Sequence, residues 1–212
     1  MDAKQLFSYE MDEEELAEWT SIKAQIYEDC KKADIPESFM RSHVDTMVSE
    51  KSFEHSAGYC RYTGFYYVYS ERGNAEKLYS GDEAGMRFFL LKDIFRSYGM
   101  RRECENREKL SEEWKSYQKD MFTLKPPLVK HTRAVLKTIK NKNYIYGVRY
   151  DSRKFWFEYT INSIDKILGT EYSAQVIEEY TKYMNRWFDD EHWAFSKASG
   201  KFIEMSESEE KK

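Results

Sequence analysis

The sequence predicts an α+β fold in which an antiparallel three-stranded meander packs with amphipathic helices and a C-terminal hairpin-helix-hairpin unit follows. The first observation is the spacing of apolar residues, which changes from three or four to two near residue 57 and back near residue 82. The second is a pair of turn signals, Thr63-Gly64 and Gly73-Asn74, which divide the period-two segment into three strands. A chain of 212 residues is long enough to bury a core around these elements.

An amphipathic helix is expected near the N-terminus. Its apolar residues recur every three or four positions and therefore share one side of a helix. They are Leu16, Trp19, Ile22, Ile26, Tyr27 and Cys30. The acidic residues 12–15 suit the N-terminal end of the helix dipole, and Lys31 and Lys32 suit its C-terminal end. Pro36 follows the predicted end of this helix.

The next two elements are the meander, between Ala57 and Ser80, and a long helix. Asp82 is the expected N-cap of this helix, because a short polar side chain can accept from the free amides of a first turn. The helix continues through MRFFLLKDIFRSYGMRRECENR. Its predicted inward residues are Met86, Phe89, Leu90, Ile94, Ser97 and Cys104.

Two further helices are expected before residue 140. Ser111 is placed as the N-cap of the first of them. Pro126-Pro127 must interrupt that helix, because proline lacks the amide donor that a helix interior requires. The second helix is expected at residues 129–139, and the polar run KNKN then ends a first region, residues 1–140.

Residues 141–205 are predicted to form a ββαββ region. Aromatic and apolar residues alternate in YIYGVRY and FWFEYTI, and with the intervening DSRK they favour a hairpin. Ser173 is the expected N-cap of a helix, and HWAFS and KFIEM form a final hairpin around Gly200. The pattern leaves open whether this region is a separate domain. Residues 206–212 are expected to be a disordered, solvated tail.

The composition of the chain disfavours nucleic acid and membranes as partners. With 34 basic and 38 acidic residues the net charge is −4, which gives no general attraction for nucleic acid or an anionic membrane. No apolar run approaches the ~20 residues that span a bilayer, and the acidic N-terminus differs from a secretory signal. A cytoplasmic location is expected. The three cysteines are far apart and form no CxxC, which disfavours a disulfide framework or a zinc site.

Motifs for catalysis and cofactor binding are missing from the sequence. The histidines form no HxH or HExxH, and the glycines form no phosphate-binding loop. No GxSxG elbow is present, and no cysteine has a histidine partner that the sequence reveals. We therefore expect no catalytic residue, no metal and no cofactor, and a small-molecule ligand is disfavoured. The acidic run Asp189–His192 is most simply a solvated helix end.

The positive signal is the tyrosine-rich stretch GFYYVYSERG. Tyrosine and arginine are enriched at protein interfaces, and an arginine at a rigid turn beside tyrosines is typical of a binding hot spot. The candidate partner-binding residues are Tyr66, Tyr67, Tyr69, Glu71 and Arg72. The alternative is a sheet that is covered on both faces, with Glu71 and Arg72 merely pairing with neighbours, and residue statistics favour this alternative.

A structural polar set is expected on the long helix. Glu103 and Arg107 lie one helical turn apart, which suits an ion pair. Asp93 lies near the middle of the same helix. If Glu103 and Arg107 are buried near Arg72 or Asp93, they determine how the helix docks on the meander.

The order of these motifs resembles the immunity protein 63 family of bacterial polymorphic toxin systems. Family members carry a strand that ends in Ser-Glu-Arg-Gly, then a helix with an Asp near its middle and Glu-x-x-x-Arg near its end. The matching positions here are Gly64, Tyr67, Val68, Ser70, Glu71, Arg72, Gly73, Asp93, Glu103, Arg107, Ser111, Glu113 and Trp114. The resemblance covers residues 10–125 and departs from the family at Pro126-Pro127.

This resemblance implies a cytoplasmic protein, without catalytic activity, that binds and neutralises a cognate toxin domain. Two alternatives remain open at this stage. The first is an enzyme that acts on carbohydrate or nucleotide through an unrecognised pair of carboxylates. The second is a non-catalytic scaffold or adaptor, in which the aromatic residues are all core. The sequence does not indicate the oligomeric state.

Overall fold

The structure, a computed structural model, describes residues 1–48, 54–122, 145–187 and 192–205. Several predicted features lie outside these residues: the break at Pro126-Pro127, the helix at 129–139, the region boundary at 140 and the tail at 206–212. Helices are combined with a three-stranded sheet and a two-stranded sheet, which confirms the α+β prediction.

The chain divides into two compact units, which are described separately. Unit 1 comprises Met1–Tyr98 and Thr160–Glu179. Unit 2 comprises Gly99–Tyr159 and Tyr180–Lys212. Three long helices, α5 (Glu83–Phe122), α7 (Ile145–Leu168) and α8 (Thr170–Trp187), contribute residues to both units.

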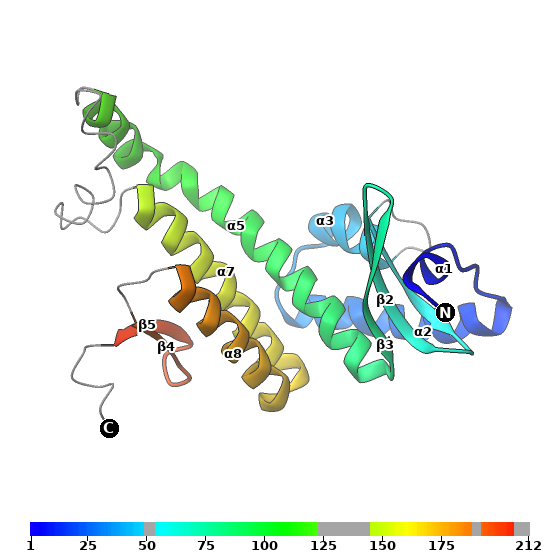
Figure 1. Cartoon of the computed structure of the whole chain (residues 1–212). Helices are drawn as coiled ribbons and strands as arrows, with labels where there is room; N and C mark the ends of the chain where they lie inside the picture. The colour runs from blue at the N-terminus through cyan, green and yellow to red at the C-terminus, as the bar shows by residue number, and fades with distance from the viewer. Residues whose placement is uncertain (49–53, 123–144, 188–191, 206–212) are drawn as a thin grey trace. The chain divides into compact units, whose positions relative to one another are not determined.

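The predicted meander is the sheet of unit 1, and its strands follow one another in the order β1-β2-β3 (Figure 1). They are β1 (His55–Cys60), β2 (Gly64–Glu71) and β3 (Asn74–Gly81). Both pairings are antiparallel, and the register places Tyr66 opposite Gly58 and Ser80. A bulge follows Tyr67, where β3 contains one extra residue.

Helices cover both faces of this sheet. The short helix α1 (Ala3–Phe7) lies on one face (Figure 1). There Leu6 packs with Tyr66 and Val68. Helix α5 lies on the other face, where Phe89 stacks on Tyr79 at 5.3 Å between ring centroids. We call these the α1 face and the α5 face. Asp82 caps α5 as predicted, because its Oδ1 accepts from the Gly85 amide at 2.8 Å.

The predicted N-terminal helix is α2 (Glu13–Lys32), and its N-cap is Asp12. Its buried stripe begins at Glu15 rather than at Leu16, which is exposed. At the other end, Asp34 has a φ of 59° and the Ile35 amide bonds back to the Cys30 carbonyl, which is a Schellman ending. A helical segment follows, comprising α3 (Glu37–Phe39), the π-helical turn η1 (Met40–Val44) and α4 (Asp45–Val48).

Helix α5 corrects one prediction, because it continues through Ser111 to Phe122. Ser111 is therefore not an N-cap. A serine can start a helix but does not stop one, since its backbone keeps both the amide donor and ordinary dihedral freedom.

Residues 145–161 correct a larger prediction: they belong to helix α7 and form no hairpin. From Phe157 onward the buried positions follow helical spacing, with Thr160, Ile161 and Ile164 enclosed. The turn DSRK contains no glycine or proline, so nothing in it stops a helix. Gly99 of α5 lets α7 approach closely, because a Cβ at Gly99 would lie 3.2 Å from the Cα of Trp156. Packing against another helix therefore overrides the aromatic β-propensity.

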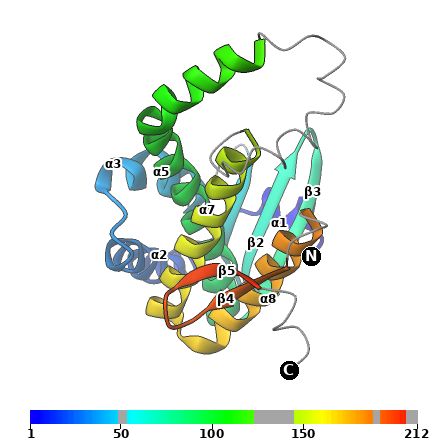
Figure 2. The same ribbon diagram turned by 90° about the vertical axis from the view of Figure 1, so that its left-hand side faces the viewer.

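The final hairpin is confirmed as β4 (His192–Ser196) and β5 (Lys201–Met205). In unit 2 it packs on the second half of α8 (Figure 2). There the Trp193 amide donates to Asn185 Oδ1 at 2.7 Å. Ser173 is not the N-cap of α8, which begins at Thr170. Instead, the Ser173 hydroxyl is buried and donates to Asp165 Oδ1 at 2.7 Å.

Candidate protein-interaction site

Three of the five predicted interface residues lie at the turn between β2 and β3. Glu71 pairs with Asn74, so the two-residue turn is Arg72-Gly73, one position earlier than predicted. The φ angles are 50° at Arg72 and 82° at Gly73. Positive φ at both central residues is the pattern of a type I′ turn, which matches the twist of the flanking strands. We call Tyr69, Glu71 and Arg72 the Arg72 turn.

Arg72 occupies a position that normally selects another residue. A type I′ turn favours Asn-Gly, and a side chain with a Cβ costs about 1–2 kcal/mol in left-handed backbone. The Arg72 side chain is 90% exposed, and its Nε lies 3.8 Å from Glu71 Oε1. Ion pairs between solvated side chains contribute little stability, so this contact does not offset the backbone cost.

Tyr69 supports the turn from the strand side. Its hydroxyl donates to Glu71 Oε2 at 3.2 Å, and its ring lies 5.0 Å from the His55 ring. Burial, followed by the bond to Glu71, raises the pKa of the Tyr69 phenol. The half-buried tyrosine holds the Glu71 carboxylate while the guanidinium of Arg72 remains in solvent.

Tyr66 and Tyr67 correct the predicted interface. Tyr66 is 1% exposed on the α1 face, and a Cβ at Gly58 would lie 2.7 Å from its hydroxyl. Tyr67 is fully buried on the α5 face. Neither side chain can contact a partner while the sheet is folded. At these two positions the alternative of a sheet covered on both faces is the correct one.

The Tyr67 hydroxyl joins the sheet to α5. It donates to Asp93 Oδ2 at 3.0 Å and lies 2.8 Å from His55 Nδ1. Because the single phenol proton points at the carboxylate, the imidazole is placed to donate to the phenol oxygen. Burial and the Asp93 charge raise the pKa of Tyr67 far above its usual value. Asp93 also pairs with Arg96 at 3.1 Å.

Asp93 thus links α5 to the meander through the Tyr67 hydroxyl. Glu103 and Arg107 lie in α5 as well, but their side chains are outside the described part of the structure. Their ion pair stays a prediction.

His55 gives this network a pH dependence. Burial lowers the pKa of its imidazole in the folded protein, although the nearby Asp93 opposes the shift. As pH falls through about 6.5, the unfolded chain takes up this proton first, and the free energy of unfolding should decline until the folded pKa is passed. Urea unfolding from pH 7.5 to pH 5 measures the decline. His55→Gln should remove it and His43→Gln should not; an unchanged profile for His55→Gln contradicts the assignment.

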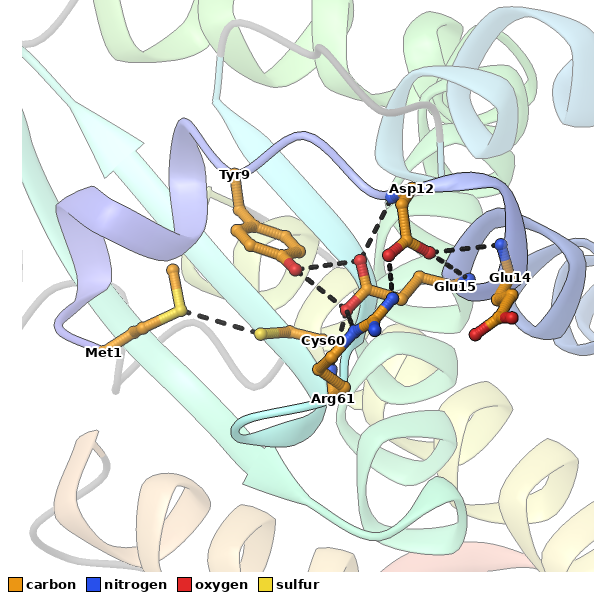
Figure 3. Close-up of polar contacts among 7 residues, drawn as sticks. All are labelled: Met1, Tyr9, Asp12, Glu14, Glu15, Cys60 and Arg61. Carbon is orange, nitrogen blue, oxygen red and sulfur yellow. Dashed lines mark hydrogen bonds and ion pairs between the residues drawn. The ribbon is translucent and has the colours of Figure 1, made fainter.

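A second rigid turn lies at the opposite end of β2, where Glu15 binds Arg61 (Figure 3). Glu15 is only 2% exposed. Its Oε1 accepts from the Arg61 amide at 2.9 Å and from Arg61 Nε at 3.2 Å. Its carboxylate also accepts from the Tyr9 hydroxyl at 2.8 Å and from the Asp12 amide at 3.1 Å. Asp12 completes the arrangement through an ion pair with Arg61.

Sequence reasoning missed this cluster. The spacing of Asp12 and Glu15 is that of a capping box, and this local signal was visible. The contact with Arg61 was not, because it joins residues 46 positions apart. The several donors at the buried Glu15 carboxylate join the start of α2, Tyr9 and the Arg61 turn into one arrangement.

No family model, curated protein or solved structure matches this chain. Among the described residues, His, Cys, Asp and Glu nowhere gather in threes that could hold a metal ion. Within the same residues, no helix is both long and apolar enough to cross a membrane. The structure therefore indicates the fold class, an α+β protein with exposed hairpin turns, but no family.

Proposed function

We propose that this chain is an immunity protein, which binds and neutralises a cognate bacterial toxin through the Arg72 turn. The observation that carries the proposal is an exposed arginine held at positive φ, where asparagine or glycine would cost less. A residue that adopts an unfavourable backbone conformation without gaining a stabilising contact is a candidate for a functional role. The resemblance of residues 10–125 to the immunity protein 63 family supplies the kind of partner.

The mechanism is occlusion of the toxin by surface complementarity. A guanidinium presents a planar set of donors that suits a carboxylate or a carbonyl pair on the partner. The two-residue turn fixes the backbone that carries Arg72, and the Tyr69–Glu71 bond holds the neighbouring carboxylate, so little backbone entropy is lost on association. Neutralisation in this form needs no cofactor and takes place in the cytoplasm.

The test is protection of cells. The proposal predicts a toxin gene beside the gene for this chain. That toxin is expressed alone and together with this chain, and survival and co-purification are measured. Survival with a stable complex is expected. Normal cell death in the presence of abundant soluble protein would remove the proposal.

The role of Arg72 is tested against a control substitution at Asp34, which also has positive φ. Arg72→Asn should raise the free energy of unfolding by about 0.5–1 kcal/mol, because it creates the favoured Asn-Gly turn, and should weaken toxin binding at least about tenfold. Asp34→Gly removes the backbone strain at Asp34, the other non-glycine residue with positive φ in the described part of the chain. It should stabilise similarly without affecting binding. Thermal melts and calorimetric titration measure both effects. Equal binding by Arg72→Asn and wild type would contradict the proposed site.

A scaffold or adaptor is the second candidate, and the burial of Tyr66 and Tyr67 favours it. An adaptor would not protect cells from the neighbouring toxin. The survival assay therefore separates the two candidates.

A further inference from the structure

Tyr62 is the most exposed large apolar side chain among the described residues, at 77%. It lies in the turn Arg61–Thr63, which connects β1 to the first residue of β2. The Arg72 turn lies at the opposite end of β2. Single exposed apolar residues are common and need no explanation by themselves. What distinguishes Tyr62 is the turn that carries it.

The turn is held from both sides. Its first residue, Arg61, is bound through both backbone and side chain by the buried Glu15 (Figure 3). Its last residue, Thr63, donates its amide to the Cys60 carbonyl at 3.1 Å and accepts from the Ser80 hydroxyl at 3.3 Å. The backbone that carries the tyrosine ring is therefore ordered before any partner arrives, which lowers the entropic cost of binding.

The start of α2, which contacts this turn through Asp12 and Glu15, is acidic. Residues 10–18 contain six acidic side chains and no basic one. Five of these side chains are exposed: Glu10, Asp12, Glu13, Glu14 and Glu18. The cation of the turn itself, Arg61, already pairs with Asp12 and Glu15. The tyrosine offers the contact area, and the carboxylates determine which sign of charge the opposing surface must have.

We propose that the Tyr62 turn is a second attachment point for the toxin and contacts a positively charged patch on it. This inference rests on the proposed immunity function and adds the chemistry of the partner surface. Lysine or arginine side chains of the toxin lie against the Tyr62 ring face, where cations are attracted to the aromatic quadrupole. The acidic residues around the turn accelerate association by electrostatic steering.

The first experiment measures the affinity of the purified toxin domain encoded beside this chain, in a catalytically inactive form. Tyr62→Ala should weaken binding at least about 30-fold, while its melting temperature stays near that of wild type because the side chain is exposed. Tyr183→Ala, which removes another exposed tyrosine, is the control and should bind like wild type. If wild type binds but Tyr62→Ala binds equally well, only this inference fails. If wild type does not bind, the proposed function fails with it.

The second experiment tests the sign of the charge. Glu14→Gln should slow association about two- to fivefold in low salt, and the difference should vanish at about 0.5 M salt. Glu171→Gln removes an exposed acid from the first turn of another helix, α8, and should leave association unchanged. Equal rates for both variants, or faster association of Glu14→Gln, overturn the assignment of a basic partner. Gel filtration of wild type and of Tyr62→Ala, each alone, identifies self-association that depends on Tyr62, which would overturn it as well.

Discussion

Gly64→Ala is expected to destabilise the protein by more than about 3 kcal/mol and to leave little folded protein at 37 °C. Gly64 has a φ of 76°, where an alanine costs about 1–2 kcal/mol. In addition, a Cβ at this position would collide with the carbonyl oxygen of Gly81 on β3. That atom belongs to a paired strand and cannot rotate away as a side chain would. Urea unfolding followed by circular dichroism measures the loss.

Gly73→Ala is the matched control at the other end of the same strand. Gly73 has a comparable φ of 82°, but no atom lies within 4 Å of where its Cβ would stand. This variant should lose only the backbone contribution of about 1–2 kcal/mol. Similar losses for the two variants would mean that the collision with Gly81 is relieved by movement of β3.

Glu15→Ala is expected to cost about 3 kcal/mol, because it removes a buried carboxylate from several donors at once. The Arg61 amide and the Tyr9 hydroxyl both lose their acceptor. The guanidinium of Arg61 is half exposed and retains Asp12, which limits the penalty. Thermal unfolding provides the measurement.

Glu14→Ala gives the comparison for this variant. Glu14 occupies the same first turn of α2, but its side chain is exposed. Its removal should cost less than about 1 kcal/mol, mainly through the helix dipole. If Glu15→Ala is no more destabilising than Glu14→Ala, the cluster does not hold the Arg61 turn.

Most of unit 1 could be predicted because its signals are local. The meander follows from alternation interrupted by Gly64 and Gly73, and both glycines have positive φ. Asp82 could be recognised as an N-cap from its place before an apolar-periodic helix. In α7 the same kind of reasoning was wrong, because a short aromatic alternation is compatible with a helix once another helix packs against it.

The candidate site was predictable in part. Exposure of Glu71 and Arg72 follows from their place at a hairpin turn, which loops out of the sheet. Burial of Tyr66 and Tyr67 depends on which helices cover the two faces, and alternation alone indicates only that the two side chains point in opposite directions. The Glu15–Arg61 contact was missed for the same reason. The exposure of Tyr62 was missed because the turn was predicted at Thr63-Gly64, whereas it lies at Arg61–Thr63.

The sequence by itself determined the α+β class, the strand order of the meander, the final hairpin and the capped start of α5. These depend on dihedral preferences and hydrogen bonds between residues close in the chain, which the residue types encode directly. Only the tertiary structure decided that 145–161 is helical, that two tyrosines are enclosed and that Glu15 immobilises the Tyr62 turn. Those outcomes are set by burial between segments far apart in the chain, where the free energy gained by packing exceeds local propensity.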